Sequence, residues 1–482
     1  MIFIGIDIGT QSIKAIAVTE KGDKVAFASE ELKDVYSPRD GWKEQNPLEW
    51  EKGLMDVLKK TIKDISYKGY SLSEIVAISV DGTSGTIIAI DEYNRPLLNA
   101  IMYNDSRSIR EAEFINQLAT DFEKKLGYVF NSSFALPKIL WVKNNLPEIY
   151  SRTKKFVHQA DYIVGLLTGI YDITDHSNAL KTGFDLLEYT WPEFIFKSLQ
   201  IDKDKLPQVV SPGTKIGTIS KKISEETGIP PNVIVVAGMT DGCAGQIASG
   251  TVKEGEWNSI LGTTLVLKGI TDRLLIDPLG RIYSHLHPEG LWMPGGASNT
   301  GGECIEEIFL GVDYNKWNKE AEKFLPSNLI IYPLVRKGER FPFVNPDAKG
   351  FIMGNYENKY ELYLGYLEGV GLTEKLCYEV VQQLGAIVGD KIFVTGGAVK
   401  SKLWLKIRAS ILNKNLVIPE ISESAMGSAI TAASKTFYNN VFEAASNMVK
   451  LKETVGPENT LIKAYEDKYE KFILLMKQNG YI

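Results

Sequence analysis

Cysteine and histidine are scarce in this chain of 482 residues, which has three cysteines and four histidines. The cysteines, Cys243, Cys304 and Cys377, are odd in number and widely spaced, which excludes a disulfide framework and indicates core thiols. Among the histidines, His285 and His287 alternate as strand neighbours would, but no further His or Cys lies nearby, so we expect no zinc site. A Walker A lysine motif and a kinase-type glycine-rich loop are both lacking, so a nucleotide site would need another architecture.

Long basic and long apolar runs are lacking as well. The formal net charge is -6, and without a basic tail or Lys/Arg cluster the chain has no counterion-releasing surface for nucleic acid. The first apolar run contains Asp7 and follows no basic leader, so we expect neither a signal peptide nor a membrane span. A cytoplasmic location is therefore expected, and any phosphate ligand must be held locally.

What remains is the composition of a globular protein, with 44% hydrophobic and 24% charged residues. Because 482 residues exceed what one hydrophobic core usually supports, we expect two or three domains. Apolar residues at helical spacing predict five helices, at residues 50–66, 108–125, 359–385, 403–412 and 461–478.

The most informative segment is residues 5–18 (GIDIGTQSIKAIAV), where two apolar runs flank a turn of small and hydroxylated residues. This density of β-branched residues predicts paired strands with Gly9 in the tight turn. Backbone N–H groups and the hydroxyls of Thr10 and Ser12 would face an anion, while Asp7 could hold Mg²⁺. An ordinary hairpin with Asp7 as a turn acceptor explains the segment equally well.

This opening pattern recurs in the second half of the chain. Residues 256–268 again read as strand, turn and strand, with Gly262 at the turn, and residues 75–85 have a counterpart at 391–401. A duplication would give two related α/β domains whose glycine-rich turns line a shared cleft. The boundary would fall near Thr240, where small, flexible residues follow a strand.

Asp241 follows a buried-type strand at 233–237 and is flanked by glycine, which is where α/β folds usually place functional groups. It is our candidate for a catalytic base. The alternative interpretation is a helix N-cap, since Asp is common at that position, and the two roles are partly compatible.

Two further segments and several glycines could bind a ligand. Residues 80–85 (VDGTSG) place a carboxylate and two hydroxyls at a strand end, and residues 103–107 (YNDSR) combine groups that recognise sugar hydroxyls. A loop ion pair between Asp105 and Arg107 is the alternative. The glycines at 396–397, and also those at 301–302, would let a planar ligand such as adenine approach the backbone.

With these residues together, the chain resembles the FGGY carbohydrate kinases of the actin and Hsp70-like ATPase superfamily over nearly its whole length. Six motifs occur in the family's order, which makes the resemblance strong. They are the first phosphate motif (7–14), GWKEQNP (41–47), the aspartate motif around Asp241, the second phosphate motif (261–264), the adenosine motif (396–411) and ESAMGSAITA (423–432).

The chain also departs from the family pattern. Ala135 stands where Pro, Ser or Thr is usual, Tyr103 replaces a common Trp, and residues 81–85 (DGTSG) stand where xylulose kinases typically carry Gln-Met-His-Gly. The last departure argues against xylulose. The segments that look like the ribulokinase-like subgroup of plants and cyanobacteria, and so favour D-ribulose, are 81–85, 102–105, 296–299 and 338–342.

The resemblance implies an α/β fold of two actin-like (ribonuclease H-like) domains, with mixed sheets flanked by helices and an ATP cleft between them. The N-terminal domain, residues 1–241, would bind sugar and phosphate. The C-terminal domain, residues 242–482, would bind adenosine, and its last helix would pack back on the N-terminal domain.

The implied reaction is MgATP-dependent phosphorylation of the terminal hydroxyl of a ketopentose, with Asp241 as base and Asp7 holding Mg²⁺. The substrate-binding residues implied are Asp81, Thr83, Ser84, Tyr103, Asn104, Asp105 and Asp241. The nucleotide-binding residues implied are Thr10, Gln11, Ser12, Lys14, Gly262, Thr263, Gly302, Gly396 and Gly397.

Alternatives remain at this stage. The substrate could be xylulose, L-ribulose, a polyol or gluconate instead of D-ribulose. A non-enzymatic nucleotide switch on the same actin-type scaffold is the rival class, because fold alone does not determine function. Such a switch has no need of residues 103–107 or of GWKEQNP, which favours the kinase. The expected partners are a small sugar and ATP, and assembly as a homodimer is left open.

Overall fold

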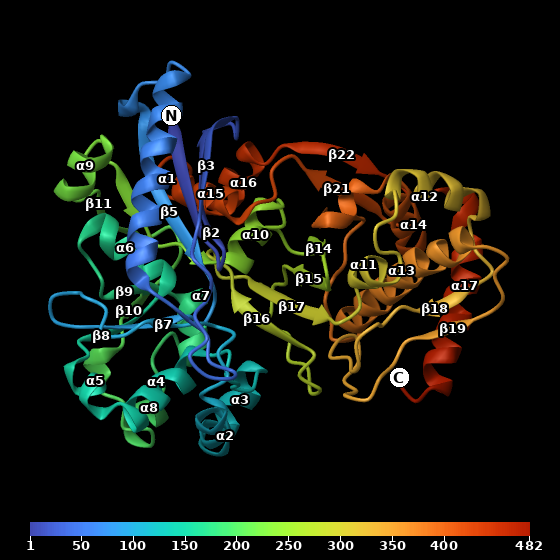
Figure 1. The fold of residues 1–482 in the computed structure, drawn as a ribbon, viewed down its shortest axis with the longest axis horizontal. Coiled ribbons are helices and arrows are strands. Elements are labelled where there is room, and N and C mark those ends of the chain that lie inside the picture. Colours follow the sequence, from blue (N-terminus) through green and yellow to red (C-terminus); the bar gives the residue numbers. More distant parts are fainter. The chain divides into compact units, whose positions relative to one another are not determined.

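The computed structural model describes all residues, 1–482, and divides into two compact units (Figure 1). Unit 1 comprises Met1–Val252, His285–Gly290 and Ile421–Lys450. Unit 2 comprises Lys253–Ser284, Leu291–Glu420 and Leu451–Ile482. None of the helices is both long enough and apolar enough to cross a bilayer.

The main sheet of unit 1 has the strand order β11-β12-β5-β1-β2-β3, with β13 paired to β5 beyond β12. β1 and β2 form the predicted antiparallel hairpin, and β5 runs parallel to β1. The strands are β1 (Ile2–Ile8), β2 (Ser12–Thr19), β3 (Lys24–Glu31), β5 (Ile75–Gly82), β11 (Lys215–Thr218), β12 (Ile234–Val236) and β13 (Met239–Thr240). Smaller sheets contain β4 (Glu44–Gln45), β6 (Ile87–Ile90), β7 (Ala100–Ile101), β8 (Lys155–His158), β9 (Ile173–Asp175) and β10 (Gln208–Val210).

Helices cover this sheet because its central strands, β1 and β5, are apolar and buried on both faces, as in α/β folds. α1 begins at Pro47, whose ring suits the first helical position, and the Asn46 side chain caps it by accepting from Leu48 N at 3.1 Å. The other helices of unit 1 are α2 (Ile109–Leu118), α3 (Thr120–Leu126), α4 (Ala135–Asn145), α5 (Pro147–Arg152), α6 (Gln159–Thr168), α7 (His176–Ala179), α8 (Glu193–Lys197), α9 (Lys221–Thr227), α10 (Asp241–Ala248), α15 (Ser424–Ser434) and α16 (Val441–Met448), while α1 spans Pro47–Tyr67.

Unit 2 repeats the arrangement of hairpin and parallel strand, which confirms the predicted recurrence. Its sheet order is β16-β17-β15-β14-β20-β21-β22, with β14 antiparallel to β15 and parallel to β20. Its strands are β14 (Trp257–Leu261), β15 (Leu265–Gly269), β16 (Ile282–Leu286), β17 (Trp292–Ser298), β18 (Ile330–Tyr332), β19 (Phe351–Met353), β20 (Lys391–Thr395), β21 (Asn415–Pro419) and β22 (Leu451–Val455). Its helices are α11 (Glu303–Ile308), α12 (Tyr314–Ala321), α13 (Lys359–Gln383), α14 (Lys402–Leu412) and α17 (Asn459–Gln478).

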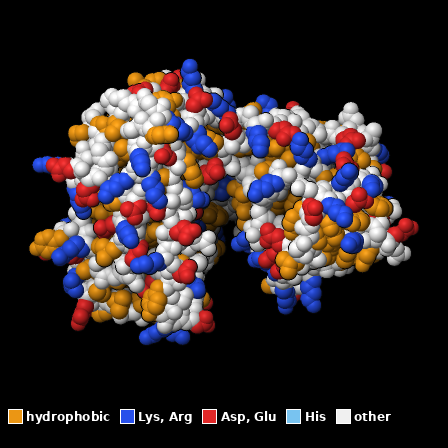
Figure 2. All heavy atoms as spheres, turned by 45° about the horizontal axis from the view of Figure 1, so that its top comes forward, with side chains coloured by type: hydrophobic (Ala, Val, Ile, Leu, Met, Phe, Trp, Pro, Cys, Tyr) orange, Lys and Arg blue, Asp and Glu red, His pale blue; other side chains and the backbone are white.

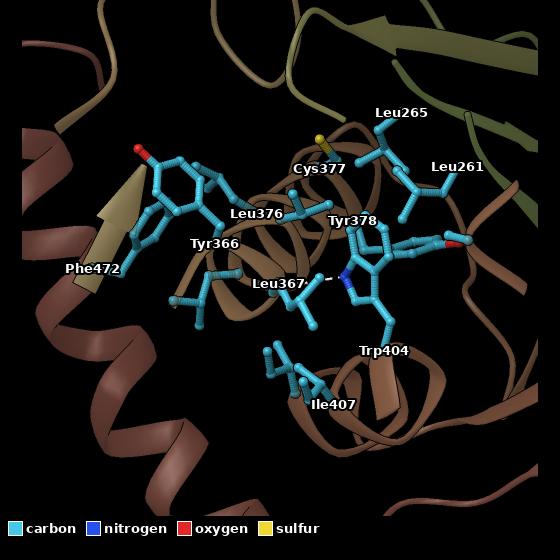
Figure 3. Close-up of a cluster of buried hydrophobic side chains, with 14 of the residues drawn as sticks. Leu261, Leu265, Tyr366, Leu367, Leu376, Cys377, Tyr378, Trp404, Ile407 and Phe472 are labelled. Carbon is cyan, nitrogen blue, oxygen red and sulfur yellow. Dashed lines mark hydrogen bonds between the residues drawn. The ribbon is translucent and has the colours of Figure 1, made fainter. Parts of the chain in front are cut away.

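The core of unit 2 is built around α13 and α14 (Figure 3). Trp404 of α14 packs among leucines of the sheet and α13, and its indole N–H donates to the Leu367 carbonyl at 3.0 Å. A buried indole needs such an acceptor. This bond therefore holds the start of α14, directly after the turn at Gly396–Gly397, against the core.

The compact units differ from the single division after Asp241 that we predicted. α10 belongs to unit 1 because it packs closely on α15: a Cβ atom on Gly427 would lie 1.8 Å from the Ala244 oxygen. α17, the last helix, belongs to unit 2, where Lys468 hydrogen-bonds to Ser327 and Tyr465 to Glu368; its packing on the N-terminal domain stays a prediction.

The helix predicted at 108–125 is two helices. The chain leaves the helical conformation at Ala119, between α2 and α3. The apolar residues Phe122 and Leu126 of α3 are buried, and the Phe122 ring stacks on Phe130 at 6.1 Å between centroids. Apolar spacing alone continued smoothly through the break, so the sequence pattern did not reveal it.

Candidate active site

Three aspartates of unit 1 lie at the carboxyl ends of neighbouring strands. Asp7 of β1 is the register partner of Asp81 of β5, and Met239 of β13 is paired with Asp81 from the other side. Asp241 follows β13 directly. The parallel pairing thus brings together the predicted metal ligand, a predicted sugar ligand and the predicted base, as expected for strand ends in an open α/β sheet.

Asp81 is the most deeply buried of the three, with no exposed surface. Its Oδ2 accepts from Ser428 Oγ at 2.5 Å, whereas Oδ1 has no hydrogen-bond partner. Burial, and then the charge of Asp7, raises the Asp81 pKa well above its usual range. Burial also raises the pKa of Asp7, opposed by its contact with Asp81 and the charge of Lys14. Two neighbouring carboxylates repel each other, so a positive charge bound between Asp7 and Asp81 would stabilise their ionised forms.

The Asp7 and Asp81 carboxylates fit a magnesium ion in one respect. A cation would satisfy Asp81 Oδ1, which lacks a partner although it is buried. No group of three or more His, Cys, Asp or Glu side chains is arranged to hold a metal. Mg²⁺ is usually bound by one or two carboxylates and completed by water and substrate phosphates, so the Asp7 and Asp81 pair would be a sufficient set of protein ligands.

Asp241 is the first residue of α10, and Thr240 is the N-cap. The alternative interpretation predicts Asp241 as the N-cap, whereas the N-cap is Thr240, one position earlier. Asp241 Oδ1 accepts from Gly242 N at 2.6 Å, and the half-buried side chain lies at the helix end where the dipole stabilises negative charge. Thr240 N donates to Ser177 Oγ at 2.9 Å, which fixes the start of the helix.

The first phosphate turn has the predicted hairpin geometry. Gly9 N donates to Ser12 O at 3.0 Å, and Gln45 Nε2 donates to Thr10 O at 2.7 Å. Thr10 and Ser12 are half-buried and Gln11 is exposed. Lys14 is the register partner of Asp7 across the hairpin, so a cationic side chain lies beside the predicted metal ligand.

Among the predicted sugar ligands, Ser84 is the most available. Its Oγ is buried without a hydrogen-bond partner. Thr83 is occupied: its N–H and hydroxyl both contact Gln159 Oε1, at 2.9 Å and 2.6 Å. Gln159 Nε2 is again buried and unpartnered. An amide donor and a hydroxyl, both buried, thus lack partners within the protein, and no signal in the sequence pointed to Gln159.

Residues 103–107 include both buried and more exposed side chains. Asp105 has no exposed side chain and accepts from Lys43 N at 2.6 Å and from the Arg107 guanidinium, which stacks on Trp42 at 3.8 Å. This is the loop ion pair of the alternative interpretation. Tyr103 is half-buried with its N–H donating to Thr86 Oγ1 at 3.2 Å, and Asn104 is exposed.

Unit 2 contains a cavity of about 670 Å³, within the usual range for small-molecule sites. Of the predicted nucleotide ligands, Gly262, Thr263, Gly302 and Gly397 line it. Gly396 does not, but its φ of +91° and a Cβ position 2.5 Å from the Leu261 oxygen require glycine there.

One wall of this cavity was not predicted from the sequence. Tyr314, Asn315 and Asn318 of α12 line it, and the Tyr363 hydroxyl donates to Asn318 Oδ1 at 2.9 Å. The polar α12 sequence carries no motif. Ser428 was likewise missed, since it meets Asp81 across 347 positions of the chain.

The surface agrees with the lack of a basic cluster. On the face drawn in Figure 2, Lys and Arg side chains are interspersed with Asp and Glu over both units.

Two α/β units, each with a glycine turn between paired strands, define the two-domain fold of the actin and Hsp70-like ATPase superfamily. Residues 2–248 match the family described as "FGGY family of carbohydrate kinases, N-terminal domain", and residues 260–436 match its C-terminal domain. The chain belongs to the FGGY family of carbohydrate kinases, and it is an ATP-dependent sugar phosphotransferase.

Named relatives agree over the whole length. The gluconokinase of Bacillus subtilis (strain 168) is 29% identical over 98% of this chain and 95% of its own length. The xylulose kinase of Staphylococcus xylosus is 27% identical over 97% of this chain and 98% of its own. The crystal structure of xylulose kinase from Rhodospirillum rubrum has the same fold, with a TM-score of 0.88, 23% identity and 99% coverage of both chains.

Proposed function

We propose that this kinase transfers the γ-phosphoryl group of MgATP to the terminal hydroxyl of a ketopentose, and that D-ribulose is its substrate. The observation that carries the proposal is the position of the DGTSG segment, residues 81–85. It ends β5 beside the strand that leads to Asp241, and its Ser84 hydroxyl is buried without a partner. A polyhydroxylated ligand would supply that partner.

Asp241 would accept the proton of the sugar hydroxyl. The hydroxyl oxygen would then form a bond to the γ-phosphorus while the bond from that phosphorus to the β–γ bridging oxygen breaks. Phosphoryl transfer depends mainly on positioning and charge neutralisation, so a carboxylate ionised at neutral pH suffices to align the nucleophile. The half-buried position of Asp241 at a helix N-terminus suits that role.

Asp7 and Asp81 would hold Mg²⁺, which supplies charge neutralisation at the phosphates when bound. Lys14, Thr10, Gln11 and Ser12 would contact phosphate in unit 1, and the turn at Gly262–Thr263 would do so in unit 2. The nucleoside would occupy the 670 Å³ cavity beside Gly302 and Gly397.

Gluconate is the second candidate substrate. The gluconokinase of Bacillus subtilis is among the relatives, and buried lysines offer a charge that could pair with a carboxylate. Lys138 is fully buried, and burial lowers its pKa to about 7. Its ammonium already donates to the carbonyls of Ser132 and Phe134, at 2.6 Å and 3.0 Å, so we favour the neutral sugar.

The test is ADP release in a coupled assay with a panel of D-ribulose, L-ribulose, xylulose, polyols and gluconate. We expect D-ribulose to have the highest kcat/KM. Activity with gluconate alone would overturn the choice of sugar and leave the kinase assignment intact. Omitting Mg²⁺ should abolish turnover with every substrate.

A further inference from the structure

Glu339 is a buried carboxylate that the mechanism above does not use. It lies in the segment 338–342 (GERFP), between β18 and β19 in unit 2, and is 3% exposed. No basic side chain is bonded to it, so its charge is satisfied by neutral donors alone. A buried carboxylate without a cationic partner is costly unless several hydrogen bonds reach it.

Five donors converge on this carboxylate. Oε1 accepts from the backbone N–H groups of Asn299 and Arg340, at 2.6 Å and 2.9 Å. Oε2 accepts from the hydroxyls of Ser298, Thr300 and Tyr332, at 2.8, 3.1 and 2.9 Å. Three of these donors belong to residues 298–300, where the chain leaves β17, so one side chain determines the course of that segment.

The segment held by Glu339 leads directly into the nucleotide cavity. Thr300 O accepts from Leu265 N at 2.9 Å, Gly302 N donates to Gly262 O at 2.8 Å, and Glu303 N donates to Thr263 O at 3.1 Å. Gly262, Thr263 and Gly302 line the cavity. The turn predicted to bind phosphate therefore rests on residues 300–303.

The contact between these two segments leaves no room for adjustment. A Cβ atom on Gly301 would lie 2.5 Å from Thr263 O, and one on Gly302 would lie 2.6 Å from Gly262 O. A second tie comes from the loop that contains Glu339, because Arg336 Nε donates to Glu303 Oε2 at 2.7 Å. A shift of residues 298–300 would thus be transmitted to the Gly262–Thr263 turn.

We propose that Glu339 is a positioning residue of the nucleotide site, holding residues 298–302 so that the Gly262–Thr263 turn keeps the shape that binds phosphate. The inference rests on the proposed role of that turn. It gives the segments 338–342 (GERFP) and 296–299 (GASN) a common physical purpose, because the Glu339 carboxylate of the first holds the backbone of the second at Asn299.

The test is calorimetric titration of Glu339→Ala and Glu339→Gln with ADP, and with the best sugar of the substrate panel. We expect Glu339→Ala to weaken ADP binding about tenfold, since it removes acceptors from several buried donors, and to leave sugar binding unchanged. Glu339→Gln should lose less, because its oxygen still serves the two N–H groups and its amide can donate to hydroxyls.

Glu361→Ala is the matched control. Glu361 is 5% exposed in the same unit and accepts from Asn328 N and Glu357 N, with no link to residues 298–303. The Glu361→Ala variant should have a lower melting temperature but unchanged ADP affinity.

Three outcomes decide against the proposed role of Glu339. Wild-type ADP affinity in Glu339→Ala, or an equal loss of ADP affinity in Glu361→Ala, would overturn the proposal. If Glu339→Ala does not fold, ADP affinity of Glu339→Gln equal to that of the wild type overturns it instead. Failure of the wild type to bind ADP would refute the nucleotide site itself.

Discussion

Asp241 combines two properties that a base in phosphoryl transfer needs. It is half-buried, so a substrate hydroxyl can reach it, and it begins a helix whose first N–H groups favour the ionised carboxylate. Asp7 and Asp81 lie on the neighbouring strands and suit a cation. At the scale of single residues, the proposed mechanism thus gives one carboxylate the role of accepting the proton and two the role of holding the metal.

Asp241→Asn should lower turnover roughly 100-fold or more, the scale of a lost general base, with the binding of both substrates largely retained. Steady-state kinetics and calorimetry of the variant measure this split. Asp91→Asn is the control, because Asp91 is also buried in unit 1 but only closes the turn to Arg95. Near-normal turnover of Asp241→Asn would remove Asp241 from the role of base.

Ser84→Ala should raise the KM for the sugar more than the KM for ATP, because the buried hydroxyl has no partner within the protein. Loss of one hydrogen bond to a neutral group predicts a change of about 5- to 10-fold. Thr86→Val tests the neighbouring hydroxyl, which is already bonded to Thr83. Equal effects of Ser84→Ala on both KM values would mean that Ser84 supports the fold and not the sugar.

The sequence predicted which residues lie at the candidate site better than it predicted which residues contact one another there. The motifs around Asp7, Asp81 and Asp241 stood at strand ends, and parallel pairing brought them together. Ser428 and Gln159 could not be found, because their contacts with Asp81 and Thr83 depend on how distant helices pack. The catalytic, substrate, metal and nucleotide roles of all these residues stay predictions.

At the scale of elements, the hairpin β16–β17 has a tip, residues 285–290, that belongs to unit 1. His176 donates to the Leu286 carbonyl at 2.9 Å, and the His287 ring stacks on Phe442 with centroids 5.3 Å apart. Burial lowers the pKa of His176 to about 4 and that of His287 to about 3. These histidines are therefore neutral in the folded protein at physiological pH.

The anchored tip predicts a loss of stability in acid. The unfolded chain protonates these histidines below pH 6.5, whereas the folded chain keeps His287 neutral to about pH 3. Their contribution to the free energy of unfolding is thus fully present above pH 6.5 and decreases as the pH falls toward the folded values.

His287→Phe keeps the stacking on Phe442 and removes one titrating group. Its melting temperature should fall less than that of the wild type between about pH 7 and about pH 5, since each pKa unit is about 1.4 kcal/mol. Differential scanning fluorimetry measures both curves. Parallel curves would show that His287 does not contribute to the acid sensitivity.

Helices and strands whose apolar residues recur at regular spacing were predicted well, but the positions where they end or break were not. The hairpins, α13, α14 and α17 follow from apolar spacing, although α14 begins at Lys402, one residue before the predicted start, with Ser401 as its N-cap. The break at Ala119 and the course of α12 depend on tertiary contacts of Phe122 and Tyr363, which leave no local signal.

At the scale of the whole molecule, the chain builds two seven-stranded sheets of related topology, one in each unit, and its later segments are divided between the two units. The repeated hairpin could be predicted because the same pattern of apolar runs and Gly-Thr turns appears twice. The return of residues 421–450 to unit 1 could not be predicted. It depends on small residues such as Gly427, which allow α15 to contact α10 and β1. The cytoplasmic location and the homodimer remain predictions.

The most direct test of the central claim is phosphorus NMR of the product formed from D-ribulose, ATP and Mg²⁺. We predict one new phosphate ester, coupled to the two protons of a terminal carbon, formed in equal amount with ADP and absent with Asp241→Asn on the same time scale. An ester at a ring or internal carbon, or ester formation only when gluconate replaces D-ribulose, would contradict the account.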